Sequence, residues 1–256
     1  MILRRITSSL KGQHWMTIVI ELMIVIIGVF IGTQVSNWNE GRLEKKQTAR
    51  MLEQLKPELD VQIDYFASVR QYYQTTQHYA DAALAGWHGD AGISNEQFVI
   101  SAYQASQVYG IGTNAQNWTL VFGGGQLRNI DNPVLRRHLA DVLTTDYSDV
   151  GLATMQTRYR TDVRLLIPDD IQREIRARCG DRLVRDAADQ DINVLPQRCS
   201  LPLDKAEVAA TASALRTHAS LAHELALHLG SVDGYLQNVD FIEIPMRTLR
   251  SDLGKR

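Results

Sequence analysis

The chain has 256 residues, of which 45% are hydrophobic and 22% charged, and its formal net charge is −2. This balance excludes a disordered acidic tail and a histone-like nucleic-acid-binding protein. Two cysteines are too few for a small disulfide-rich domain, and 17 glycines with 6 prolines exclude a collagen-like or proline-rich chain.

An apolar segment near the N-terminus covers residues 16–35 and contains a single ionisable side chain, that of Glu21. As a helix it would be about 30 Å long, which matches the hydrocarbon thickness of a bilayer. Trp15 and Trp38 flank it as candidate interfacial anchors, because tryptophan is enriched where membrane meets water. No Ala-x-Ala-like cleavage site follows. We therefore expect a permanent transmembrane helix at 16–35, in contact with the lipid bilayer, after a short cytoplasmic N-terminus at 1–15.

The positive-inside rule does not decide the orientation of this anchor. The residues directly before it and the first 15 after it carry similar numbers of Lys and Arg. Cys179 and Cys199 give a second indication, since this pair has neither a CxxC motif nor a nearby histidine that would complete a zinc site. In an oxidising compartment the pair would close a loop of about 20 residues and contribute roughly 3 kcal/mol. Two separate buried thiols are the alternative. The candidate disulfide favours a cytoplasmic N-terminus and a periplasmic or otherwise extracytoplasmic C-terminal domain.

One face of the expected transmembrane helix carries small residues. At 100° per residue, Gly28, Gly32 and Ser36 lie within about 60° of Glu21. The Gly-x-x-x-Gly spacing lets two helix backbones approach closely, and a carboxyl group inside a membrane favours a position facing protein. These four residues are therefore a candidate helix–helix interface. The alternative is a chance pair of glycines with a glutamate at the membrane boundary.

Two motifs stand out along the chain. The first consists of His14-Trp15, Ile20-Glu21, Gly28, Phe30-Ile31-Gly32, Gln34-Val35 and Asn37-Trp38-Asn39-Glu40. The second consists of Trp118, Leu120, the run from Gly123 to Ile130, Asn132-Pro133, Leu135 and Tyr147. Together they resemble the signature of a bacterial membrane-anchored protein family of unknown function. The resemblance implies one N-terminal membrane helix and a mostly helical domain outside the cytoplasm, and it implies no activity.

The rest of the chain reads mainly as helices. Apolar residues recur every three or four positions within 36–86, which predicts an amphipathic juxtamembrane stalk with a kink or restart at Pro57. Within 87–256, capping residues and prolines predict helices near 95–109 and 114–122, from Pro133 beyond Arg160, from Asp169 to Arg178 and from Asp204 onward, with a loop at 180–203. The expected fold class is mainly α: a single transmembrane helix followed by an antiparallel helical bundle.

Two sequences resemble metal sites without meeting their requirements. His223 and His228 are five residues apart, which places them about 140° apart around a helix, whereas a zinc-binding H-E-x-x-H needs a separation of four. Asp189-x-Asp191-x-Asn193 begins like a calcium loop, but Val194 replaces the required glycine and Ser200 the required glutamate. We expect ordinary helix-surface histidines and a solvated acidic loop, with no metal and no cofactor.

Arginines are concentrated between Arg158 and Arg185, where eight of them alternate with five Asp or Glu residues. Interleaved charges of this kind are typical of a solvated, salt-bridged helix face. The alternative is a site for nucleic acid or for an anionic ligand, but aromatic residues that could stack on bases are scarce here. We expect no nucleic-acid partner.

No catalytic motif is present in the sequence, which favours a protein that is not an enzyme. The leading hypothesis is a membrane-anchored interaction or scaffold protein that associates with itself through the transmembrane helix or with another protein. The alternative is a sensor-like domain that binds a ligand or ion and acts through a partner protein. An active site assembled from distant residues is a third hypothesis, and no sequence feature favours it.

Overall fold

The computed structural model describes residues 15–110, 115–123, 125–146, 155–186, 189, 191–202 and 204–255. Within these residues the fold is mainly α-helical, as the sequence predicts. The helices are α2 (Trp15–Trp87), α3 (Asn95–Gln104), α4 (Ala115–Phe122), α5 (Pro133–Thr144), α6 (Arg158–Leu166), α7 (Asp169–Cys179), α8 (Lys205–Thr217) and α9 (Ser220–Gly254), with a short 3₁₀ helix η1 at Gln126–Asn129. Strands β1 (Arg182–Arg185) and β2 (Asp191–Val194) form one antiparallel hairpin.

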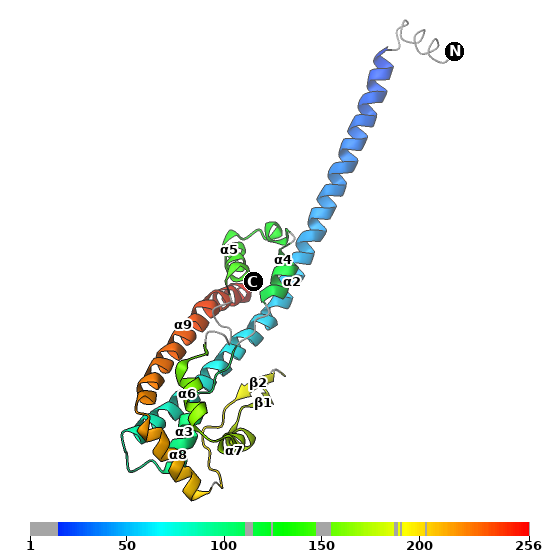
Figure 1. Cartoon of the computed structure of the whole chain (residues 1–256). Coiled ribbons are helices and arrows are strands. Elements are labelled where there is room, and N and C mark those ends of the chain that lie inside the picture. Colours follow the sequence, from blue (N-terminus) through cyan, green and yellow to red (C-terminus); the bar gives the residue numbers. More distant parts are fainter. Residues whose placement is uncertain are drawn as a thin grey trace, which may run out of the picture.

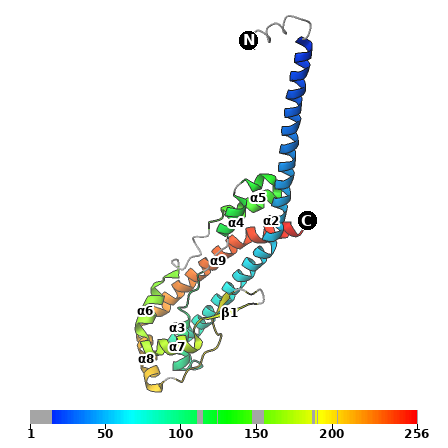
Figure 2. The same cartoon turned by 90° about the vertical axis from the view of Figure 1, so that its right-hand side faces the viewer.

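Helix α2 joins the apolar segment to the domain without interruption. Its N-terminal half projects alone from the rest of the protein, and its C-terminal half runs through the domain (Figures 1 and 2). Burial begins at Thr48 and continues on one face to Gly86. The expected stalk at 36–86 is thus the continuation of the apolar helix and, from Thr48 onward, part of the domain core. The helix also continues through Pro57, where the sequence predicts a kink or restart.

Helix α9 packs antiparallel against α2 and provides the second long element of the core. Asp60 pairs with Arg250, Arg70 with Asp240, and Gln77 donates a hydrogen bond to Asp233. In these pairs the residue number on α9 falls as the residue number on α2 rises, which is the pattern of an antiparallel pair. The C-terminal end of α9 comes back beside α2 at the end of the domain from which the apolar segment projects (Figures 1 and 2).

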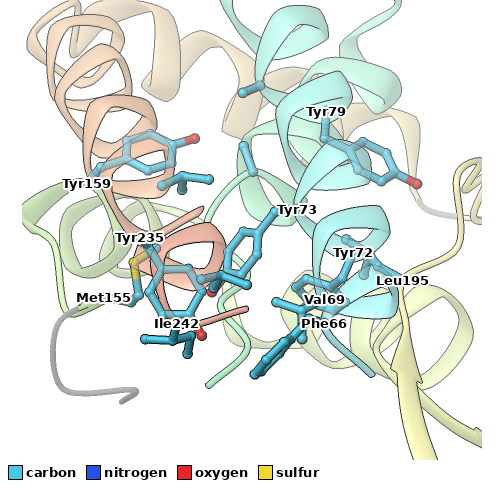
Figure 3. Packing of buried hydrophobic residues seen from close by; sticks show 14 of the residues in the cluster. Phe66, Val69, Tyr72, Tyr73, Tyr79, Met155, Tyr159, Leu195, Tyr235 and Ile242 are labelled. Atoms are coloured by element: carbon cyan, nitrogen blue, oxygen red, sulfur yellow. The ribbon is translucent and has the colours of Figure 1, made fainter. Parts of the chain in front are cut away.

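Aromatic side chains fill the space between these two helices. The rings of Tyr73 on α2 and Tyr235 on α9 are 5.2 Å apart, and Ile242 lies beside them (Figure 3). On the neighbouring side of α2, Tyr72 lies close to Leu195, which follows β2 (Figure 3). Large buried rings contribute strongly to a core because each removes a wide apolar surface from water.

Helix ends follow the local sequence signals closely. Ser94, Asn132 and Asp204 accept hydrogen bonds from backbone N–H groups in the first turns of α3, α5 and α8. Such caps satisfy donors that have no partner within the helix. The expected cap at Thr113 lies outside the described residues.

Three expected boundaries differ from the structure. The helix expected to run from Pro133 beyond Arg160 ends at Thr144, and α6 begins separately after its own cap, Thr157. The helix expected from Asp204 is divided into α8 and α9 near His218. Residues 182–194, expected as loop, contain the β1–β2 hairpin. Its strands have four residues each, which is too short for a clear alternating pattern.

Gly86 tests how tightly α2 and α3 pack. A Cβ atom at this position would overlap the ring of Phe98, which is held between Trp87 and Arg216. We expect Gly86→Ala to lower the free energy of unfolding by about 1–3 kcal/mol, as overpacking does. Gly230→Ala in α9 is the matched control: no atom lies within 4 Å of its added Cβ, so alanine should stabilise the helix by up to about 1 kcal/mol. Urea unfolding of the full chain in detergent measures both; equal effects would contradict the described packing.

Candidate functional site

The small-residue face of α2 is free of contacts with the domain. Nothing lies within 4 Å of a Cβ atom built at Gly28 or Gly32. Counting 100° per residue, these glycines lie on the side of α2 roughly opposite to the buried Leu52, Leu55 and Leu59. The domain therefore packs on one side of the helix axis and leaves the glycine side open.

The other residues singled out in the apolar segment are also exposed. Glu21 lies in the first two turns of α2, and Ser36 donates a 3.3 Å hydrogen bond to Glu40 one turn further on. Trp15 and Trp38 expose 60% and 67% of their surface. Among the described residues, α2 is the one helix that is long and apolar enough to cross a membrane, and its apolar stretch is entirely unburied.

The two cysteines lie at disulfide distance. Cys179 ends α7, and Cys199 follows β2, with their Cα atoms 5.7 Å apart. The bond joins the segment that follows the β1–β2 hairpin to the end of α7. Gln104, the last residue of α3, donates a 2.6 Å hydrogen bond to the Cys179 carbonyl oxygen. This end of α7 is thus connected covalently to one segment and by a buried hydrogen bond to another.

Seven of the eight arginines between Arg158 and Arg185 form two groups, and the eighth, Arg182, donates a hydrogen bond to the Arg178 carbonyl oxygen. The first group forms ion pairs with acidic residues four positions away: Arg158 with Asp162, Arg173 with Asp169, Arg178 with Glu174, and Arg185 with Asp189. These side chains are largely exposed, and they form the salt-bridged surface that the interleaved charges predict. Pairs of this kind contribute little to stability because water screens them.

The second group consists of Arg160, Arg164 and Arg176, and we call it the arginine cluster. Arg160 and Arg164 turn toward the C-terminal end of α3, where both donate hydrogen bonds to Ser106. Arg164 also donates to Gln107 and lies over the ring of Tyr103, 4.8 Å from its centre.

Arg176 reaches the same tyrosine from α7, with a 3.2 Å hydrogen bond to its hydroxyl group. Tyr103 therefore lies between two guanidinium groups, one over its ring and the other at its hydroxyl.

Acidic partners are scarce around the arginine cluster. Within the described part of the chain, neither Arg160 nor Arg164 has a carboxylate oxygen within 4 Å, and Arg176 has one at 3.5 Å, from Asp169. Asp181 acts on Arg160 and Arg164 from a greater distance and accepts a hydrogen bond from Tyr72.

Electrostatics reflect this shortage of negative charge. Burial lowers the pKa of Arg164, and the positive charges of Arg160 and Arg176 lower it further. The pKa of Asp181 is raised because its burial outweighs the hydrogen bond from Tyr72 and the attraction of the arginines. Like charges are thus held together here without a carboxylate between them.

A second polar site lies in the seam between α2 and α9. Glu243 is 2% exposed and forms ion pairs with Arg70 and Arg247, while the 59% exposed Asp240 pairs with Arg70 from the rim. A groove of about 840 Å³ opens beside these residues and is also lined by Gln71 and Gln74. Because the two arginines are matched by two carboxylates, the seam is neutral and internally paired, which suits a structural role.

The candidate metal ligands are dispersed. Within the described ranges no three His, Cys, Asp or Glu side chains are placed to hold a metal ion. His228 is buried, with its Nδ1 atom 2.7 Å from the hydroxyl oxygen of Thr157, whereas His223 is exposed. Asp189 and Asp191 both pair with Arg185. In the histidine motif the buried His228 is thus bonded within the protein, and in the acidic motif both aspartates are paired with one arginine.

His228 gives the domain a defined acid sensitivity. Burial lowers its pKa to about 4, helped by Arg160 and opposed by the Ala105 backbone. The unfolded chain, with a histidine pKa near 6.5, binds the proton more readily. The contribution of neutral, buried His228 to the free energy of unfolding is therefore fully present above pH 6.5. It is lost as the pH falls from there through 4.

We expect the unfolding free energy of the full chain to fall by about 2 kcal/mol between pH 7 and pH 5 because of His228. Urea unfolding at both values measures the loss. His228→Gln should remove it, whereas the same substitution at the exposed His218 should leave it in place. An equal pH dependence in wild type and His228→Gln would contradict this assignment.

Comparisons with protein-family models, with curated proteins and with solved structures found no match to this chain. The resemblance of its two motifs to a membrane-anchored family accordingly stays a prediction from the residues themselves.

Proposed function

We propose that this chain is a single-pass membrane-anchored protein whose helical domain has a non-catalytic interaction or scaffold role. The observation that carries the proposal is the continuity of α2, whose unburied apolar segment leads directly into the domain core. A helix that is apolar on all sides and unburied over some 20 residues has the length and surface suited to lipid. A rigid connection of this kind suits a protein that presents its surface at a fixed distance from a membrane.

The proposed orientation has the N-terminus in the cytoplasm and the domain outside it, in the periplasm of a bacterial cell. The cysteine pair supports this orientation, because disulfides persist in oxidising compartments and are rare in the cytosol. Cys199 is partly exposed and Cys179 is buried, so a thiol reagent should distinguish them.

Thiol labelling of intact spheroplasts tests this orientation. A membrane-impermeant maleimide should label the wild-type chain from outside only after reduction. Cys179→Ser, which leaves Cys199 without a partner, should be labelled from outside without reductant. Labelling that needs cell lysis in both cases, with no effect of reductant, would reverse the proposed orientation.

The proposed interaction begins with a second copy of the same chain. The open glycine side of α2 supports it, since close backbone approach at Gly28 and Gly32 meets no obstruction from the domain packed on the other side. Glu21 and Ser36 would lie in the same helix–helix interface.

Amine-reactive cross-linking in native membranes should give a dimer, because the glycine faces allow the two helices to pack. The double variant Gly28→Ile, Gly32→Ile should lose the dimer, since the larger side chains separate the backbones. Gly41→Ile, beyond the apolar segment and on the domain side of the helix, should retain it. A wild-type chain that yields only monomer would exclude self-association through this face.

A second candidate function is a ligand-binding, sensor-like domain that acts through a partner protein. The arginine cluster favours it, because two of its guanidinium groups, those of Arg160 and Arg164, have no carboxylate oxygen within 4 Å among the described residues and are suited to bind an anion. This role is compatible with the membrane anchor and concerns a different surface of the protein.

A further inference from the structure

The arginine cluster is formed where two consecutive helices, α6 and α7, meet the end of α3, which is distant from them in sequence. Arg160 and Arg164 come from α6, Arg176 comes from α7, and all three meet the end of α3 at Tyr103 and Ser106. The acceptors of Arg160 and Arg164 are neutral: the Ser106 carbonyl oxygen, the Ser106 hydroxyl group and the Gln107 amide oxygen. Arg176 donates to the Tyr103 hydroxyl group and also pairs with Asp169. One arginine would be enough to satisfy the free carbonyl oxygens at the end of α3, and here two arginines donate to the same residue, Ser106.

Within the part of the chain that the structure describes, these guanidinium groups use only some of their hydrogen-bond donors. Each guanidinium has five N–H groups, whereas Arg160 uses one nitrogen, Nη1, and Arg164 uses two, Nε and Nη2. The fully buried polar side-chain atoms without a hydrogen bond, within the described residues, are Glu224 Oε2, His228 Nε2 and Glu243 Oε1. The other nitrogens of Arg160 and Arg164 are not among these atoms, and both residues are half-buried.

Positive charge is in excess at this position. Asp181 acts on both Arg160 and Arg164, and Asp169 is shared between Arg176 and the exposed Arg173. The ends of the helices offset part of the remaining charge, and the arginines still repel one another. A bound anion would relieve this repulsion.

We propose that Arg160, Arg164 and Arg176 form a binding site for a phosphate group, either inorganic phosphate or a soluble phosphate ester. Guanidinium groups bind phosphate oxygens through paired, charge-assisted hydrogen bonds, and three converging groups match a tetrahedral oxyanion with several acceptors. The inference deepens the second candidate function, since it names the ligand class of a sensor-like domain.

The distance between the arginine cluster and the apolar segment, measured along α2, excludes a lipid headgroup of the anchoring membrane as the source of phosphate. Tyr72, which connects α2 to Asp181, is 37 residues beyond the end of the apolar segment. At 1.5 Å per residue the separation is about 55 Å, far greater than the thickness of a headgroup layer. The ligand must therefore come from solution.

Thermal unfolding of the full chain in a non-ionic detergent tests the site. Titration with sodium phosphate should raise the Tm in a saturable way above that in sodium chloride of equal ionic strength. In ³¹P NMR the free phosphate line should broaden when the wild-type chain is added. Identical Tm values in the two salts, together with an unbroadened line, would overturn the proposal.

Matched variants separate binding from a structural role. Arg164→Gln should weaken phosphate binding at least about tenfold, and so should Arg176→Gln. The Arg176 side chain is 46% exposed, so its replacement should leave the fold intact. Arg178→Gln, an exposed arginine of the same helix paired with Glu174, should bind like the wild type. If Arg176→Gln and Arg178→Gln both bind like the wild type, the cluster is not the site. A negative result here leaves the anchored interaction role intact, because labelling and cross-linking test that role separately.

Discussion

The antiparallel pairing of α2 with α9 holds the domain to its projecting helix. A single helix in water gains little stability from its own hydrogen bonds, and most helical stability in proteins comes from packing an apolar face. Here the face of α2 from Leu52 to Ala83 is covered by elements that include α9, α3 and β2, with Tyr73 and Tyr235 at the centre of the seam. Ion pairs between α2 and α9 lie along the edge of this seam and fix its register.

Burial within the seam also explains where charge is tolerated. Glu243 is almost fully buried, and removing a carboxylate from water is costly unless opposite charges compensate. Arg70 and Arg247 provide that compensation from two different helices. The arginine cluster shows the converse arrangement, in which neutral oxygens and an aromatic ring surround the guanidinium groups. The two polar sites of the domain thus differ in charge balance, and this difference separates a structural contact from a candidate binding site.

Much of the fold could be predicted from residues acting locally. The apolar stripe from Leu52 to Phe66, the caps at Ser94, Asn132 and Asp204, and the start of α7 at Asp169 all depend on neighbours within one or two turns. The division between α8 and α9 and the β1–β2 hairpin depend instead on distant contacts. For example, β2 packs on α2, and the segment after it is bonded to α7 through Cys199. Such contacts leave no periodic signal in four-residue strands.

The charge summed over residues 158–185 does not single out the arginine cluster within the range where an anionic ligand is the alternative, although the sequence carries a local signal. Arg158, Arg173, Arg178 and Arg185 each have an acidic residue three or four positions away, whereas Arg160, Arg164 and Arg176 have none. Ion pairs between successive turns of a helix need this spacing, so Arg160, Arg164 and Arg176 cannot form them. They contact the end of α3 instead. The spacing of charges, rather than their sum, distinguishes the two groups.

The uninterrupted course of α2 also has a mechanical consequence for a chain anchored through residues 16–35. The far end of α2 at Trp87 is 52 residues beyond the apolar segment, or about 78 Å along the helix. Membrane helices commonly tilt by 0–40°, and a change of about 10° would displace that end sideways by roughly 14 Å. If two such anchors paired as proposed, a small change of tilt would be amplified into a large change in the separation of their two domains. With residues 16–35 in a membrane, as proposed, the helix would act as a lever whose short arm is the apolar segment.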